Sequence, residues 1–315
     1  MIRDKVLIIG SGLMGSGIAS RSALAGHKTV LLDADAETAE RGLQKALACI
    51  DELEENKLAD SAGAAKARTL ISTSTNLEDA CAQAEYVIEA IYENLEAKQE
   101  MFAKLDALLP PEIIILSNTS GLRITDIAAK MQLHPERALT AHFWFPGHLV
   151  PLVEIVIGDR SNPALAEDAK KLLLNWGKAP VIVKRDLPGQ LANRILQAVI
   201  REAVSIVEIG LCEPEDVDLA IKMGMGIRFP VWGPLEHVDA VGLELCRNVQ
   251  ATVLPDISAA ALPSKCFDEK IVAGEFGAKS GKGFYDWSVK SMDALAERRN
   301  RFIIEALQFH QRNPG

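Results

Sequence analysis

The chain of 315 residues has no long apolar run, no excess of positive charge and no clustered cysteines. No segment approaches the ~18 uninterrupted apolar residues of a membrane span, so no membrane partner is expected. The N-terminal residues lack the basic and apolar regions of a signal peptide. A net charge of −9 argues against nucleic acid as a partner. The five cysteines stand singly, which favours reduced thiols, a cytoplasmic protein and no metal site.

A glycine-rich motif stands near the start of the chain. An apolar run at residues 5–9 leads directly into Gly-Ser-Gly-Leu-Met-Gly at residues 10–15. Gly10 permits a sharp turn, Gly12 lets a pyrophosphate approach the backbone, and Gly15 lets the next helix pack against the sheet. The start of that helix offers unpaired N–H groups to phosphates. The residues predicted to contact a dinucleotide are Gly10, Gly12, Leu13, Met14 and Gly15.

Asp33 completes this fingerprint. It ends a second apolar run, at residues 29–32, where a carboxylate accepts hydrogen bonds from a ribose diol. The same carboxylate would repel a 2′-phosphate, and residues 34–36 contain no Arg or Lys to bind one. The cofactor is therefore predicted to be NAD rather than NADP. The alternative interpretation is a glycine-rich turn followed by an Asp with no such role.

The remaining pattern divides the chain in two. Short β-branched runs alternate with helical stretches, and the clearest strands are predicted at 5–9, 29–33, 86–90, 113–117, 138–142, 152–156 and 179–183. This alternation predicts an α/β fold with a Rossmann-type, doubly wound parallel sheet in residues 1–186. After Pro188 and Gly189 the pattern is helical only, which predicts an all-helical domain in residues 187–315.

Polar motifs follow several predicted strands, where ligands of open α/β sheets bind. They are Ser117-Asn118-Thr119-Ser120, the segment 141–146 with His142, Glu154 in its strand, Pro188-Gly189-Gln190-Leu191-Ala192-Asn193-Arg194, and Lys279-Ser280-Gly281-Lys282-Gly283-Phe284-Tyr285. Over essentially the whole chain, these motifs resemble the 3-hydroxyacyl-CoA dehydrogenase family. The resemblance implies an NAD-dependent dehydrogenase that oxidises a hydroxyl, typically β to a carboxyl or thioester.

His142 is the predicted general base, because removal of a hydroxyl proton needs a group that titrates near neutral pH. Glu154 is expected to accept from the other imidazole nitrogen and to stabilise the imidazolium. Ser120 and Asn193 match the family's positions for holding the reacting oxygen, and are predicted to be catalytic and substrate-binding residues. Taken alone, His142 would be read as a buried structural residue, Glu154 as an edge-strand carboxylate and Asn193 as a helix cap. Their joint spacing favours catalysis.

Further cofactor contacts are implied by the resemblance at Glu93, Lys98, Asn118 and Lys279. For Glu93 and Lys98 the alternative interpretation is an exposed ion pair on one helix face.

Three departures from the family bear on the substrate. Phe145 and Gly121 replace an Asn and a Ser that are usual in members acting on acyl-CoA. The helix after Asp33, rich in Lys in those members, carries four carboxylates in the segment 51–55, which would repel the phosphates of CoA. The alternative is a solvated acidic face, with other cations binding CoA. Those cations are Lys57, Lys66 and Arg68.

Arg228 is the third departure. An Arg recurs there in relatives that oxidise small free acids, such as gulonate and carnitine dehydrogenases, and a similar basic residue occurs in a member from pyridoxine degradation. An Arg fork binds a carboxylate bidentately, so Arg228 is a predicted substrate-binding residue. A place in a subunit interface is the alternative.

The sequence therefore favours a small hydroxy acid as substrate over a CoA thioester, which stays the alternative. A non-catalytic NAD-binding structural protein is a third hypothesis, which the set of His142, Glu154, Ser120 and Asn193 disfavours. The helix predicted at 191–208 is apolar over more than one face, and relatives are homodimers through this domain, so a homodimer is expected.

Overall fold

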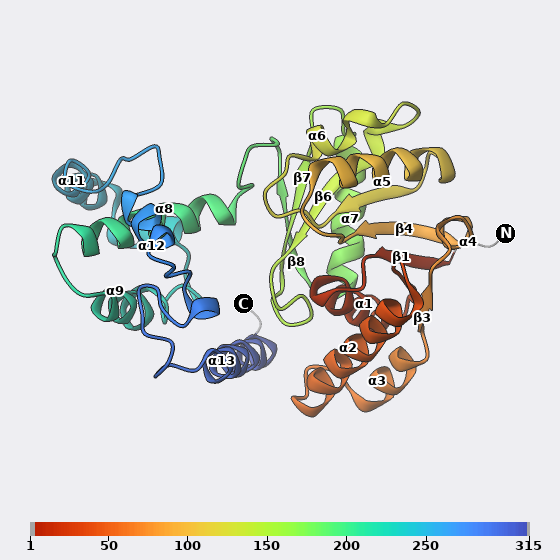
Figure 1. The fold of residues 1–315 in the computed structure, drawn as a ribbon, viewed down its shortest axis with the longest axis horizontal. Coiled ribbons are helices and arrows are strands. Elements are labelled where there is room, and N and C mark those ends of the chain that lie inside the picture. Colours follow the sequence, from red (N-terminus) through yellow and green to blue (C-terminus); the bar gives the residue numbers. More distant parts are fainter. Residues whose placement is uncertain (1–3, 314–315) are drawn as a thin grey trace. The chain divides into compact units, whose positions relative to one another are not determined.

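A computed structural model describes residues 4–313, which form two compact units (Figure 1). The first unit comprises the chain up to Ala192 together with the residues from Ile303 onward, and the second runs from Asn193 to Phe302. The sequence pattern placed the boundary near residue 187 and assigned the whole C-terminal helix to the second domain. The structure instead packs the end of that helix with the first unit.

The first unit is built on one eight-stranded sheet of order β3-β2-β1-β4-β5-β6-β7-β8. Its strands are β1 (Lys5–Ile9), β2 (Lys28–Leu32), β3 (Ile71–Ser74), β4 (Ala84–Glu89), β5 (Ile114–Ser117), β6 (Ala138–Phe143), β7 (Leu152–Ile157) and β8 (Ala179–Val183). Its helices are α1 (Leu13–Leu24), α2 (Ala36–Glu55), α3 (Ser61–Arg68), α4 (Leu77–Ala82), α5 (Leu95–Leu108), α6 (Ile124–Ile127) and α7 (Pro163–Asn175), with 3₁₀ turns η1 (Ala128–Lys130) and η2 (Pro135–Arg137). The strand order reverses between β1 and β4, which is where ligands of this architecture bind.

Both faces of the sheet are buried, because helices cover each of them. Successive residues of a strand point to opposite faces, so they belong to two different core clusters. Val6 and Ile8 of β1 pack in a core cluster with residues of α1, α2, α3 and α7. Leu7 and Ile9 belong to a second cluster, which includes Phe102 of α5. This two-sided burial explains why β1 reads as a continuous apolar run, and it confirms the predicted Rossmann-type fold.

Two features of the sheet differ from the sequence prediction. β3 was not predicted, because Ile71–Ser74 is short and its middle residues are exposed. β7 runs antiparallel to β6, in an otherwise parallel sheet. The reversal follows from the short connection between them, since a parallel pair needs a long crossover. As a result, His142 and Glu154 stand directly opposite each other in register.

The second unit is helical. Its elements are α8 (Ala192–Glu208), α9 (Pro214–Ala220), a π-helical turn η3 (Ile221–Met225), α10 (Pro234–Val241), α11 (Leu243–Val253), α12 (Lys265–Val272) and a 3₁₀ turn η4 (Ala278–Ser280), and α13 (Met292–Arg312) leads back to the first unit. The helical pattern of residues 235–253 predicts one continuous helix. It is broken at Gly242, whose φ is +98°. No helix among the described residues is long and apolar enough to cross a membrane.

Candidate active site

The glycine motif forms a tight turn between β1 and α1. A Cβ atom on Gly10, whose φ is +97°, would lie 2.6 Å from the carbonyl oxygen of Ala90, and one on Gly15 would lie 1.8 Å from the carbonyl oxygen of Gly10. A Cβ on Gly12 would meet no atom within 4 Å. Helix α1 begins at Leu13 without a side-chain cap, so its first N–H groups are available to an anion. This open, uncapped helix start fits a pyrophosphate.

Asp33 follows β2 and is held in place by the same turn. Its Oδ2 accepts hydrogen bonds from the N–H and the hydroxyl of Ser11, at 2.8 and 2.6 Å. Its Oδ1 accepts from the N–H of Ala34 at 2.8 Å. Burial opposes ionisation, but these bonds outweigh it and hold the pKa of Asp33 below its usual value. An ionised, oriented carboxylate beside the glycine turn fits the ribose diol of NAD.

Glu93, after β4, binds the turn that contains Ser120. Its Oε1 accepts from the hydroxyl of Thr119 at 2.6 Å and from the N–H groups of Ser120 and Gly121 at 3.0 and 2.9 Å. Despite partial burial, these bonds and the positive charge of Lys98 lower the pKa of Glu93. The carboxylate therefore fixes the loop after β5 at the carboxyl edge of the sheet.

Lys98 lies in the interior, with only 1 % of its side chain exposed. Its Nζ donates to Glu89 Oε1 at 2.6 Å and to the carbonyl oxygen of Ile91 at 3.3 Å, and lies 3.5 Å from Glu93 Oε2. The alternative of an exposed ion pair on one helix face is therefore wrong. Glu93 precedes α5, and Lys98 is buried under the loop that follows β4.

Asn118 joins the ends of three strands. Its N–H donates to the carbonyl oxygen of Glu89 at 2.7 Å, and its Oδ1 accepts from the N–H of Phe143 at 2.9 Å. These contacts hold the edge on which cofactor binding is predicted. The contact of Asn118 with the cofactor stays a prediction.

His142 and Glu154 form a buried pair on adjacent strands. His142 Nδ1 lies 2.8 Å from Glu154 Oε2. His142 is 5 % exposed and Glu154 is fully buried. Because an ionised carboxylate only accepts hydrogen bonds, this contact assigns the proton of the neutral imidazole to Nδ1. The lone pair is then on Nε2, as a general base requires.

Glu154 receives three further hydrogen bonds. Trp144 Nε1 donates to Oε2 at 2.9 Å, and the N–H groups of Leu191 and Ala192 donate to Oε1 at 2.9 and 2.8 Å. Burial raises the pKa of Glu154, but the bonds from His142, Ala192, Trp144 and Leu191 outweigh it and bring the pKa to about 2. The carboxylate is therefore ionised at neutral pH beside the imidazole.

The other predicted site residues lie in the second unit. Asn193 is the second residue of α8. Lys279, in η4, is exposed, and its Nζ lies 5.2 Å from the ring centroid of Phe276. Arg228 is exposed, and its Nε donates to the carbonyl oxygen of Gly224 at 3.2 Å, just after the π-helical turn. Their roles toward cofactor and substrate stay predictions.

Sequence reasoning missed three residues around this site. Trp144 and Glu89 are described above. Gln190 has a φ of +54°, and its Nε2 donates to the carbonyl oxygen of Thr119 at 3.0 Å. The Pro-Gly pair before Gln190 could have indicated this contact, because it predicts a turn, and a turn there brings the Gln190 side chain back to the edge of the sheet.

Two family models match the chain. The NAD binding domain of 3-hydroxyacyl-CoA dehydrogenase matches residues 5–187, and the C-terminal domain of the same enzyme matches residues 189–287. The chain belongs to the 3-hydroxyacyl-CoA dehydrogenase family. It is an NAD-dependent dehydrogenase that acts on a hydroxyl group, which confirms the predicted cofactor and reaction class.

Individual members of the 3-hydroxyacyl-CoA dehydrogenase family differ in substrate. The chain is 33 % identical over 304 residues to 5-formyl-3-hydroxy-2-methylpyridine 4-carboxylate 5-dehydrogenase of Mesorhizobium japonicum, covering 96 % of this chain and 97 % of that protein. It is 36 % identical over 288 residues to a probable 3-hydroxybutyryl-CoA dehydrogenase of Bacillus subtilis, covering 91 % and 98 %. A solved structure of the pyridine-carboxylate enzyme, described as an NAD⁺-dependent dismutase, has a TM-score of 0.89 with 31 % identity and covers 99 % of both chains. The (S)-3-hydroxybutyryl-CoA dehydrogenase of Ralstonia eutropha has a TM-score of 0.75 with 31 % identity, covering 90 % and 99 %.

Proposed function

We propose that the protein oxidises a hydroxyl group of a small carboxylic acid with NAD, rather than that of a CoA thioester. The far end of α2 supports this choice. Arg68, one of the cations available to CoA phosphates, is bound by Asp51 Oδ1 and Glu54 Oε2, at 2.6 and 2.5 Å. The positive charge of Arg68 is thereby neutralised by two carboxylates, and a polyphosphate approaching it would meet both of them.

The likeness to the pyridine-carboxylate enzyme supports the same substrate class, since the name of that enzyme specifies a carboxylate on a small ring. On this chain, Arg228 is the proposed partner of the substrate carboxylate. Within residues 4–313 it forms no salt bridge, and its guanidinium is exposed. An exposed Arg without a carboxylate partner suits the binding of a substrate carboxylate.

The catalytic roles follow from the chemistry of the side chains. When bound, NAD accepts the hydride from the carbinol carbon. We propose that His142 Nε2 takes the hydroxyl proton, since its Nδ1–H is committed to Glu154. Glu154 holds the imidazole in this tautomer and stabilises the imidazolium that forms. Ser120, whose N–H is fixed by Glu93, and Asn193 are proposed to hold the reacting oxygen.

A screen for NADH formation tests this substrate class. We expect absorbance at the NADH wavelength to rise with small hydroxy acids, including hydroxymethyl-pyridine carboxylates, and not with 3-hydroxybutyryl-CoA. Arg228→Ala should weaken binding of the active acid by about 1.5–3 kcal/mol, the range for a hydrogen bond to a charged group. Arg228→Lys should restore only part of the loss.

Affinity for NAD serves as the control and should not change in either variant. Good turnover of 3-hydroxybutyryl-CoA together with no effect of Arg228→Ala would contradict the proposal and favour the CoA thioester.

We further propose a cytoplasmic homodimer. Helix α8 supports the dimer, because Ile195, Leu196 and Val199 are 37–56 % exposed on it, more apolar surface than a solvated helix usually carries. The free cysteines agree with a reducing compartment. Sedimentation at micromolar concentration should give twice the chain mass, and Ile195→Glu should shift the mass toward the monomer. A wild-type monomer would rule the dimer out.

A further inference from the structure

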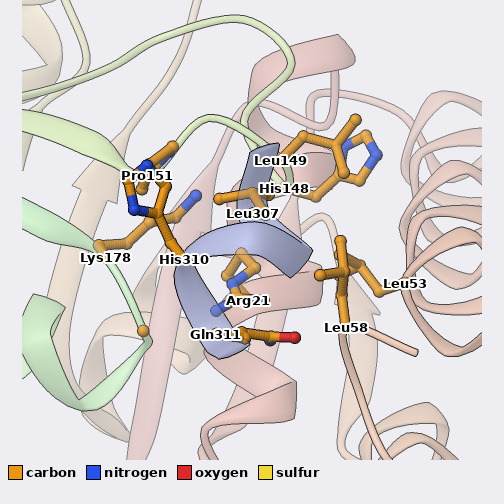
Figure 2. A pocket seen from close by; sticks show the side chains of 11 residues that line it. Arg21, Leu53, Leu58, His148, Leu149, Pro151, Lys178, Leu307, His310 and Gln311 are labelled. Atoms are coloured by element: carbon orange, nitrogen blue, oxygen red, sulfur yellow. The ribbon is translucent and has the colours of Figure 1, made fainter. Parts of the chain in front are cut away.

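A pocket of about 390 Å³ lies in the first unit, and no predicted cofactor or catalytic residue is among the residues that line it (Figure 2). Its wall is formed by α1, the far end of α2, the loop between β6 and β7, the residues before β8 and the end of α13. In Figure 2, Arg21 comes from α1, Lys178 precedes β8, and His310 comes from α13. A pocket of this size suits a small organic molecule.

Two cations line the pocket without an acidic partner. Lys178 is 5 % exposed, and its Nζ donates to the carbonyl oxygens of Gly147 and Val150 at 2.6 and 2.8 Å. Arg21 is bound through Nε and Nη2 to a single carbonyl oxygen, that of Trp176. Among the residues that the structure describes, neither cation forms a salt bridge. Burying a charge without a counter-charge is costly, so this arrangement favours an anion.

Glu52, a carboxylate that contacts the pocket wall, is already engaged. Glu52 Oε2 lies 2.6 Å from His148 Nε2, and His148 is 8 % exposed. Burial lowers the pKa of His148, and the charges of Lys178 and Arg21 lower it further against the effect of Glu52. Burial and the charge of Arg21 likewise hold the pKa of Lys178 well below its ordinary value. A bound anion would relieve these penalties.

The rest of the wall selects among anions. Four leucines also line the pocket, namely Leu53, Leu58, Leu149 and Leu307. Inorganic phosphate would use only the charged side, whereas an organic carboxylate would also cover the leucines. His310 is exposed at the end of α13 and adds a further ring nitrogen to the wall.

We propose that this pocket binds a small carboxylate with an apolar body, at a second site separate from the predicted dehydrogenase centre. Arg21 and Lys178 bind the carboxylate group, and the leucines bind the apolar body.

The test uses the full chain with sodium benzoate as the probe, measured by isothermal titration calorimetry at pH 7. We expect one benzoate to bind per chain with a millimolar dissociation constant. Benzamide, which has the same shape without the charge, should bind at least about tenfold more weakly, and so should inorganic phosphate. Equal binding of benzamide or of phosphate would overturn the proposal.

Variants locate the site. Arg21→Gln should weaken benzoate binding at least about tenfold, and the matched control Lys45→Gln, which removes an exposed cation from α2, should leave it unchanged. Since Arg21→Gln also removes a bond to Trp176, a variant at the rim, His310→Glu, provides an independent check and should weaken binding by repulsion, at least about fivefold. Retained affinity in both Arg21→Gln and His310→Glu would refute the site.

Arg228→Ala separates this site from the substrate carboxylate site and should not change benzoate binding. If Arg228→Ala alone abolished it, the benzoate would be reporting the substrate site, and the second site would be refuted while the proposed function stood.

Discussion

Replacing Glu154 by Gln tests the mechanism most directly, because it keeps the size of the side chain and removes its charge. The carboxylate accepts from two donors at each oxygen, His142 and Trp144 at one and the N–H groups of Leu191 and Ala192 at the other. An amide has only one oxygen, so one of these two pairs of donors must lose its acceptor.

The magnitude of the effect follows from these bonds. A hydrogen bond to a charged group contributes ~1.5–3 kcal/mol, so losing the charge beside the imidazolium should lower kcat roughly 10- to 150-fold. If the amide NH₂ faces His142, the proton is also forced onto Nε2 and the base is blocked, which lowers the rate further. The acid limb of the pH–rate profile should move to lower pH, because the imidazolium loses its stabilising carboxylate.

Stability should change in the same variant. The folded pKa of Glu154, about 2, lies below the ordinary 4.5, so its ionisation stabilises the fold above pH 4.5, and this stabilisation is lost as the pH falls toward 2. Between pH 7 and pH 3 the wild type should lose about 2 kcal/mol more unfolding free energy than Glu154→Gln, measured by urea titration. An unchanged pH–rate profile and equal acid sensitivity would refute both the orienting role and the ionised state.

Three other variants test neighbouring parts of the site. His142→Gln should lower kcat by roughly 10²–10⁴ without changing the Kd for NAD, and near-normal turnover would exclude it as the base. The wild type should prefer NAD over NADP at least about tenfold in kcat/KM, and Asp33→Ala should narrow that ratio; a wild-type ratio near one would count against the role of Asp33. Trp144→Phe removes one hydrogen-bond donor to Glu154 and should lower the unfolding free energy by about 1–3 kcal/mol at pH 7, measured by urea titration. An unchanged unfolding free energy would show that this hydrogen bond does not form in solution.

The sequence was informative where local chemistry decides the structure. Residues 5–9 and the glycines after them predicted β1 and the turn at its end, because a strand buried on both faces is continuously apolar and the turn tolerates no side chain at Gly10 or Gly15. The antiparallel direction of β7 was not predicted, although the short connection between the strands predicted at 138–142 and 152–156 was a signal for it.

The contacts around Glu154 and α2 depend on distant parts of the chain. The donors Leu191 and Ala192 stand nearly forty residues after Glu154, and only the folded chain brings them to it. The acidic segment 51–55 was interpreted as repelling phosphates, and the structure adds that Asp51 and Glu54 are bound to Arg68 from α3, one of the cations that the sequence left available to CoA. A charge pattern gives the sign of a surface but not which charges are already paired.

The junction between the two units is bonded to Glu154 itself. Leu191 and Ala192, the last residues of the first unit before its helical neighbour, donate both of their N–H groups to the oxygen that His142 does not use. The segment that links the two units therefore also holds the carboxylate that orients the proposed base. A backbone movement at Leu191 or Ala192 would strain these bonds and disturb the carboxylate that orients the imidazole. In this protein, a substitution that changes the flexibility of the chain at Leu191 or Ala192 would also affect proton transfer by His142.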